Sequence, residues 1–143
     1  PLPETDADAL RRVTAVWETC GAEVTSMSVA HHDEVLAATS HLPHMLAFGL
    51  VDALARMREN DEFFRYAAGG FRDFTRIASS NPVMWRDICL ANREALSAML
   101  ARFGIEMTDL AESIRNADGE RLLAIFERAK AARDRYVDAS RIE

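Results

Sequence analysis

Apolar positions recur every three to four residues along most of this chain, which is the spacing of one face of an α-helix. Glycines at Gly69-Gly70 and Gly104 interrupt the pattern, and Asn81-Pro82 is a typical helix start with a capping side chain and a proline. We therefore predict an all-α chain that forms a helical bundle. The expected helices cover about residues 5–20, 32–58, 60–66, 73–78, 82–103, 108–116 and the segment from 118 onward.

The first 28 residues differ from this pattern. A helix is followed at residues 22–27 by a short run that resembles a β-strand, and one strand cannot form a sheet without a neighbour. The start lacks a methionine, and Pro1-Leu2-Pro3 resembles a loop cut from a longer chain. We expect residues 1–28 to be the end of an α/β domain and residues 29–143 to be a separate helical domain.

The segment from Leu42 to Leu54 is apolar on almost every side of the expected helix. Such a helix is buried on all sides, and a domain of this size offers few places to bury one. We therefore predict that this segment forms an oligomer interface. Pro43 is expected to kink or divide the helix, because proline lacks the N–H of a helical hydrogen bond.

Composition limits the classes of function. The net charge of −6 argues against a nucleic-acid-binding face, which would be basic. Cys20 and Cys89 have no CxxC partner and lie on apolar stripes, so we expect buried free thiols in a reducing compartment. The most apolar stretch, residues 45–51, is too short to span a bilayer, and no signal peptide is visible. We expect a cytoplasmic protein that binds neither membrane nor nucleic acid.

Four histidines lie close together in the chain: His31, His32, His41 and His44. His41 and His44 are three residues apart and share a helix face. A metal site with Asp33 was considered, but the spacing is not HExxH, and we predict no metal. The alternatives are histidines of the core or of helix caps, or a neutral histidine that donates a hydrogen bond to a bound polar group in dry surroundings.

A second constellation begins at Gly69-Gly70. Two glycines allow close approach of the backbone or a positive φ. Arg72 and Arg76 follow, with Asp73 between them, and we expect Asp73 to pair with one arginine. The other guanidinium would then be free to bind a carboxylate in bidentate fashion. The alternative is a glycine turn with a solvated Arg–Asp pair, and no GxGxxG dinucleotide motif occurs.

A third constellation places Trp85 in the first turn of the helix that starts at Asn81-Pro82. Packing of Trp85 in the core is the simpler interpretation. A helix N-terminus also attracts anions, and an indole can form the wall of a site for a ring-shaped ligand. No Ser-His-Asp triad, P-loop or nucleophile elbow can be assembled, so the residues alone predict an anion pocket without an identifiable catalyst.

Three motifs in this order and spacing resemble one family: His32-Asp33 with Ser40-His41-Leu42-Pro43-His44, then Gly69-Gly70-Phe71-Arg72-Asp73-Phe74-Thr75-Arg76-Ile77-Ala78, then Asn81-Pro82-Val83-Met84-Trp85-Arg86-Asp87-Ile88. On these motifs the chain resembles the C-terminal helical dimerisation domain of the prephenate/arogenate (cyclohexadienyl) dehydrogenase family. The resemblance covers about residues 1–105 well and the last two helices only in general character.

The resemblance implies a function that this chain alone does not complete. In that family an N-terminal Rossmann domain binds NAD or NADP, and the helical domain forms an intertwined homodimer. The reaction is oxidative decarboxylation of prephenate to 4-hydroxyphenylpyruvate, or of arogenate to tyrosine. Residues 1–28 would be the last helix and strand of the Rossmann domain, and residues 29–143 the dimerisation and substrate-contact domain. The fragment is expected to bind no cofactor and to be inactive alone.

The resemblance also implies roles for individual residues. Arg76 matches an arginine that binds a substrate carboxylate, and His44 matches a histidine that lines the substrate pocket. Gly69 and Gly70 match a loop beside the substrate.

Four more residues have matches in the family. Met84 and Trp85 match residues that wall the pocket, with the tryptophan reaching in from the partner subunit. His32 and Asp33 match a pair near the interface or pocket. The catalytic histidine and the cofactor-binding loop of the family have no match here, so we expect no catalytic, cofactor-binding or metal-binding residue in this chain.

Two other classes of function stay open at this stage: a non-catalytic helical binding or interaction module of the same fold and, more distantly, a metal-binding helical protein. The sequence does not distinguish prephenate from arogenate or NAD from NADP. It also leaves open feedback inhibition by tyrosine and a further catalytic domain downstream.

Overall fold

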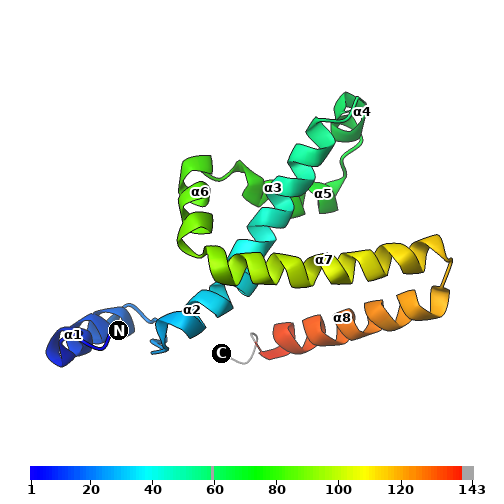
Figure 1. Cartoon of the computed structure of the whole chain (residues 1–143). Helices are drawn as coiled ribbons and strands as arrows, with labels where there is room; N and C mark the ends of the chain where they lie inside the picture. The colour runs from blue at the N-terminus through cyan, green and yellow to red at the C-terminus, as the bar shows by residue number, and fades with distance from the viewer. Residues whose placement is uncertain (59, 140–143) are drawn as a thin grey trace. The chain divides into compact units, whose positions relative to one another are not determined.

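The computed structural model describes residues 1–58 and 60–139, and within these ranges every regular element is helical (Figure 1). This confirms the all-α class. The chain divides into two compact units, residues 1–99 and 100–143. The elements in order are α1 Ala7–Thr19, α2 Val29–Leu36, η1 Ala37–His41, α3 Leu42–Ala55, α4 Asn60–Arg65, α5 Gly69–Thr75, η2 Arg76–Ser79, α6 Pro82–Ala91, α7 Arg93–Arg115 and α8 Gly119–Ala139.

Helix α1 begins where the sequence predicts it. The side chain of Asp6 accepts a hydrogen bond of 2.7 Å from the N–H of Ala9, and Gly21 leaves the helix with a positive φ of 82°. The apolar stripe that includes Val13 and Trp17 is exposed, and no residue of α1 is buried. Cys20, which we expected to be buried, is exposed for the same reason: nothing in the described chain covers this stripe.

The strand predicted at residues 22–27 does not form. These residues have no regular secondary structure, and no strand occurs anywhere in the described ranges. The physical reason is that a strand is stabilised by hydrogen bonds to a neighbouring strand, which this stretch lacks. The assignment of residues 1–28 to a nucleotide-binding domain stays a prediction.

Of the two predicted effects of Pro43, a kink or a division of the long helical run, the division does not occur. Elements α2, η1 and α3 follow one another without a gap from residue 29 to residue 55, and η1 is a π-helical turn. The N–H of Leu42 bonds to the carbonyl of Ala37, five residues back. This wider turn lies immediately before Pro43, where the ordinary helical pattern would need the N–H that proline lacks.

The second half of the chain is segmented differently from the prediction. The helix expected over 82–103 is broken at Asn92, which lies between α6 and α7. Gly104 does not end a helix, because α7 continues through it to Arg115 and includes the separate helix expected at 108–116. Asp118 opens the last helix as predicted, since its side chain accepts a bond of 3.0 Å from the N–H of Arg121.

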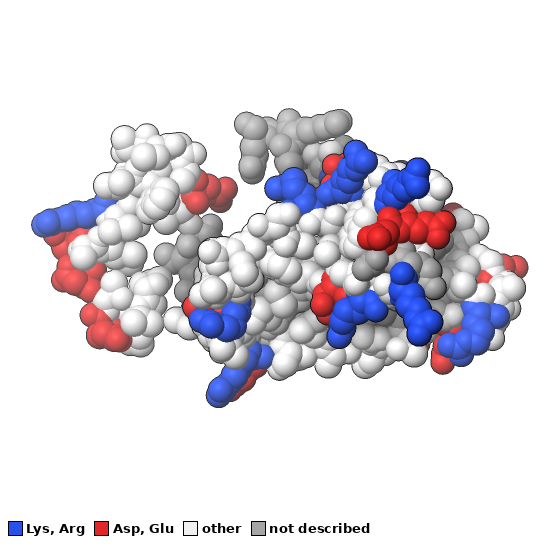
Figure 2. Space-filling view, turned by 90° about the horizontal axis from the view of Figure 1, so that it is seen from above, with Lys and Arg blue, Asp and Glu red and all other residues white. Residues whose placement is uncertain are grey.

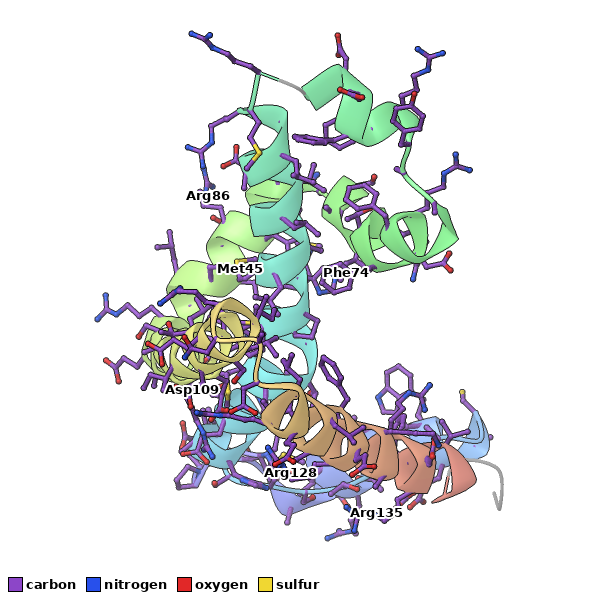
Figure 3. The ribbon with its side chains drawn as sticks, turned by 90° about the vertical axis from the view of Figure 1, so that its right-hand side faces the viewer. Met45, Phe74, Arg86, Asp109, Arg128 and Arg135 are labelled. Atoms are coloured by element: carbon purple, nitrogen blue, oxygen red, sulfur yellow. The ribbon has the colours of Figure 1, made fainter. Side chains whose placement is uncertain are left out.

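The core of the first unit lies around α3. Helix α3 packs against α5 and η2, and α6 lies on its other side (Figures 1 and 3). Met45 of α3 contacts Cys89 of α6, with the two sulfur atoms 3.3 Å apart. The buried apolar side chains are Ala37, Leu42, Ala47, Trp85 and Leu96. Within the described ranges, no helix combines the length and the apolar character that a membrane span requires.

The contribution of the N-cap of α6 to stability can be tested by mutation. Its N-terminus is held by Asn81, whose side-chain oxygen accepts from the N–H groups of Val83 and Met84 at 2.9 and 3.1 Å. Asn81→Ala should lower the free energy of unfolding by about 1 kcal/mol, measured by urea denaturation. Asn116→Ala, at an exposed position after α7, should change it by less than about 0.5 kcal/mol. Equal losses in the two variants would contradict a specific role of the cap.

Candidate functional site

Two of the predicted site residues, His44 of α3 and Trp85 of α6, form a stacked pair. Their ring centroids are 3.7 Å apart and the rings are inclined by 22°. The Nδ1 atom of His44 lies 2.9 Å from the carbonyl oxygen of Ser40. A carbonyl only accepts, so Nδ1 carries the proton and donates, which leaves Nε2 of the neutral ring as an acceptor. This corrects the expectation that a neutral histidine here would donate to a ligand.

Trp85 carries an unmatched donor. The side chain is 7% exposed, and its buried Nε1 has no hydrogen-bond partner in the described structure. A buried N–H without an acceptor costs free energy, so this atom is a natural partner for an acceptor that is absent from the chain itself. The resemblance implied that the tryptophan reaches in from a partner subunit. Within this chain Trp85 is buried against His44, because α6 packs beside α3, and the contact with a partner subunit stays a prediction.

A second histidine supports the pair from the side. The His41 ring meets Trp85 edge-on, with centroids 6.1 Å apart and an interplanar angle of 80°. Nδ1 of His41 lies 3.1 Å from Nδ2 of Asn92, and the same amide nitrogen lies 2.8 Å from the carbonyl oxygen of Asp33. Burial lowers the pKa of His41; the nearby charge of Asp33 opposes this shift, and His32 and His44 add to it.

The glycine pair lies in a helix and not in a loop. Gly69 and Gly70 are the first residues of α5, and neither has a positive φ. The positive φ that we considered for them is therefore wrong. Both are exposed, and a Cβ built on either would meet nothing within 4 Å. The space beside them is open on this chain.

The arginines beside the glycines are both exposed and unpaired. Among the described residues, neither Arg72 nor Arg76 makes an ion pair or a side-chain hydrogen bond. The predicted pairing with Asp73 is wrong, since Asp73 contacts neither guanidinium. Arg72 lies near the end of α5 and Arg76 begins η2, so two guanidinium groups are available to an anion where we expected one.

The remaining predicted residues lie on α2 and α6. Met84 is next to Trp85 and about half exposed. His32 and Asp33 form the expected local pair, with Nδ1 and Oδ1 3.1 Å apart, and both side chains are largely exposed. The backbone carbonyl of Asp33 reaches the His41–Asn92 cluster. Within the described structure, no hydrogen bond, ion pair or ring contact joins Arg76 or the glycines to the stacked pair.

Charges of both signs are mixed on the face shown in Figure 2, where Lys and Arg side chains are interspersed with Asp and Glu. That face therefore carries no extended basic patch that would attract anions. Within residues 1–58 and 60–139, no three histidine, cysteine or acidic side chains converge in the way that a metal ion requires.

A hollow of about 520 Å³ lies between α3, α4 and α5. Its lining is mostly apolar, with Leu54, Phe63 and Phe71, and its one charged lining residue is the acidic Glu62. A multiply charged anion does not fit such a lining, because no group in it would replace the water around a carboxylate. We therefore do not place an anion-binding site in this hollow.

Comparison with known proteins identifies the family of this chain. The family model described as "Prephenate dehydrogenase, dimerization domain" matches residues 28–128. The chain belongs to this family. Its match begins at the N-cap of α2 and ends within α8.

Two curated relatives of this dimerization domain are similar over nearly the whole chain. A cyclohexadienyl dehydrogenase of Zymomonas mobilis is 39% identical over 135 residues, which cover 93% of this chain and 46% of that protein. A prephenate dehydrogenase of Bacillus subtilis is 35% identical, over 94% of this chain and 36% of that protein. The chain thus spans less than half the length of these relatives.

Solved structures give the same result. The chain is 42% identical to a prephenate dehydrogenase from A. aeolicus in complex with hydroxyphenyl propionate and NAD+, with a TM-score of 0.85 over 93% of this chain and 47% of that one. A Synechocystis arogenate dehydrogenase is 27% identical, with a TM-score of 0.82 over 95% of this chain and 50% of that one.

The sequence reasoning missed the part played by Asn92. Its side chain is buried at 8% exposure and contacts residues more than 50 positions earlier in the chain. The available signal was a polar residue between Cys89 and Leu96 on an otherwise inward stripe. Such a residue in a core has its hydrogen bonds satisfied by specific partners, which the one-dimensional pattern does not identify.

His41 gives this dimerization domain a defined dependence of stability on pH. Its folded-state pKa lies below 6.5, the ordinary value. As the pH falls below 6.5, the unfolded chain therefore takes up the proton first, and stability present above that pH is lost. The free energy of unfolding should fall more steeply between about pH 6.5 and 5 in the wild type than in His41→Gln. A difference between the two that stays constant from about pH 8 to 5 would contradict this reading.

Proposed function

We propose that this chain is the C-terminal part of a prephenate or arogenate dehydrogenase of tyrosine biosynthesis, supplying substrate contacts and the dimer interface. The complete enzyme would carry out NAD(P)-dependent oxidative decarboxylation of prephenate to 4-hydroxyphenylpyruvate, or of arogenate to tyrosine. Membership of the family supports this proposal, and the single structural observation that carries it is the His44–Trp85 pair with its unmatched indole N–H.

The chemistry of the pair suits a cyclic substrate with carboxylate and hydroxyl groups. The indole Nε1–H of Trp85 is a donor, and Nε2 of neutral His44 is an acceptor. Trp85 is buried and His44 is half-buried, and a hydrogen bond that matches a ligand contributes more in such surroundings than it would in water. We assign Trp85 and His44 to substrate binding, with Met84 beside them as part of the same wall.

We assign the carboxylate contact to Arg76. A guanidinium with no ion-pair partner among the described residues can offer two parallel N–H groups to one carboxylate. The open space at Gly69 and Gly70 lets a ligand or a second chain approach the start of α5. His32 and Asp33 would lie at the interface or the edge of the pocket.

We place NAD or NADP in a part of the enzyme outside this chain. The printed sequence has no GxGxxG motif, and the described residues form no sheet from which a phosphate-binding loop could emerge. When bound, the nicotinamide would supply the hydride acceptor. The residues of this chain would bind and orient the substrate, and we assign none of them a catalytic role. We also propose that the protein is cytoplasmic.

Arg76 can be tested against a matched residue four positions earlier. In the complete enzyme, Arg76→Ala should raise KM for the substrate by about 30- to 800-fold, equivalent to about 2–4 kcal/mol, because a charge-assisted pair is lost. Arg72→Ala should raise it less than about threefold, and His44→Asn should have a smaller effect than Arg76→Ala. An unchanged KM in Arg76→Ala would remove Arg76 from the site. Absence of dehydrogenase activity in the complete protein would favour the non-catalytic module.

We also propose a homodimer that uses the segment from Leu42 to Leu54. Leu50 of α3 is 37% exposed in the single chain, and many other large apolar side chains are uncovered. In sedimentation velocity at about 10 μM, the chain should be dimeric, and Leu50→Arg should shift it toward monomer. Leu123→Arg, on α8, is the matched control and should remain dimeric. A wild-type monomer, or dissociation by the control alone, would contradict the predicted interface.

A further inference from the structure

Asn92 is the least expected polar residue of the first unit. It interrupts the helical run between α6 and α7 with φ −107° and ψ 35°, and its N–H still bonds to the carbonyl of Ile88 at 3.0 Å. Its side chain is turned inward and buried. From this junction the amide reaches α2 and η1, which precede it by 59 and 51 residues.

The hydrogen bonds of this amide define the state of His41. The acceptor at 2.8 Å is the backbone carbonyl of Asp33, which cannot donate, so the atom facing it is the amide nitrogen. The second hydrogen of that nitrogen points to Nδ1 of His41 at 3.1 Å. Nδ1 must therefore be the unprotonated atom of the ring, and the proton of neutral His41 lies on Nε2.

Protonation of His41 would bring two N–H groups against each other. The titratable groups that act electrostatically on the ring are the carboxylate of Asp33 and His32 from α2, and His44 from α3. The carboxylate of Asp33 favours the charged ring, whereas burial and the two histidines oppose it. The Asn92 amide adds an N–H donor, and the ring can accept its hydrogen bond only while Nδ1 is unprotonated.

The same ring touches the proposed substrate wall. His41 packs edge-on against Trp85, and Trp85 stacks on His44. A change in the orientation or the charge of the His41 ring would therefore directly change its contact with the indole of Trp85. The order of contact is Asn92 to His41, His41 to Trp85, and Trp85 to His44.

We infer that Asn92 is a positioning residue: its buried amide holds His41 as the neutral Nε2–H tautomer and thereby fixes the orientation of the Trp85–His44 pair that binds substrate. The effect on substrate binding by the Trp85–His44 pair rests on the proposed function, whereas the effect on His41 does not. Asn92 touches neither ligand nor reacting atoms and acts only through the two rings.

The tautomer can be measured in the 143-residue chain itself, which contains four histidines. With ¹⁵N-labelled histidine, the signals assigned to His41 by their loss in His41→Gln should show a protonated Nε2 and an unprotonated Nδ1. In Asn92→Asp, the pKa of His41 should rise, because a carboxylate stabilises the charged ring that the amide disfavours. A wild-type ring protonated on Nδ1, or a pKa unchanged in Asn92→Asp, would overturn the inference.

The consequence for binding is measured in the complete dehydrogenase. Asn92→Ala and Asn92→Asp should each raise KM by about tenfold with kcat changed less than about twofold, as expected when binding shared by the ground and transition states is lost. Only Asn92→Asp should add an ionisation to the pH profile of KM, at a higher pH than that at which His41 titrates in the wild type. A purely structural defect would give both variants the same profile shape and would overturn the positioning role.

Asn116→Asp is the matched control. It makes the same chemical change at an exposed position after α7 and should leave both KM and its pH profile unaltered.

Failure of the proposed function and failure of the positioning inference give different results. If Trp85→Phe and His44→Asn leave KM unchanged, the proposed function fails while the NMR result on His41 stands. If those variants raise KM and the Asn92 variants do not, only the positioning inference fails.

Discussion

The structure of the first unit depends on covering α3, a helix that is apolar on nearly every side. Helices α5 and η2 cover one side and α6 another, and both Leu42 and Ala47 are buried by this packing. Residues such as Leu50 remain partly exposed. A helix of this composition would need still more cover than one chain of this length supplies, which is the physical basis for expecting a second copy against it.

The candidate site follows from the way in which α3 begins. The π-turn of η1 lets the helical run pass Pro43, and His41 and His44 then both face Trp85 of α6. Polar atoms are tolerated there because each has a partner: Ser40 accepts from His44, and Asn92 donates to His41. The exception is Nε1 of Trp85, the buried side-chain atom that the described structure leaves without a partner. This unmatched donor is the observation on which the proposed substrate contact of Trp85 rests.

The sequence predicted those features that local residues determine. The starts at Asp6, Asn81 and Asp118 formed where expected, because a capping side chain acts within three residues of itself. The break at Asn92 and the continuation of α7 through Gly104 were not predicted. The first depends on partners far away in the chain, and the second shows that a single glycine only weakens a helix that is stabilised by its neighbours.

The predicted strand and the predicted Asp73 pairing failed for different reasons. Residues 22–27 have strand-like character but no neighbouring strand, so the tendency is not realised. Asp73 has arginines on both sides in the chain, yet an exposed ion pair contributes so little that sequence proximity does not guarantee it. Of the predicted site, the structure brings together only His44 and Trp85 with Met84 adjacent.

The absence of a partner for Arg76 is informative about binding. If Asp73 were bound to this guanidinium, an acidic substrate would have to displace a carboxylate before making the same contact, and the net gain would be small. An unpaired arginine exchanges only water for the substrate, so most of the charge-assisted hydrogen bond is available to binding. The proposed substrate site therefore combines three kinds of group: the guanidinium of Arg76, the donor of Trp85 and the acceptor of His44.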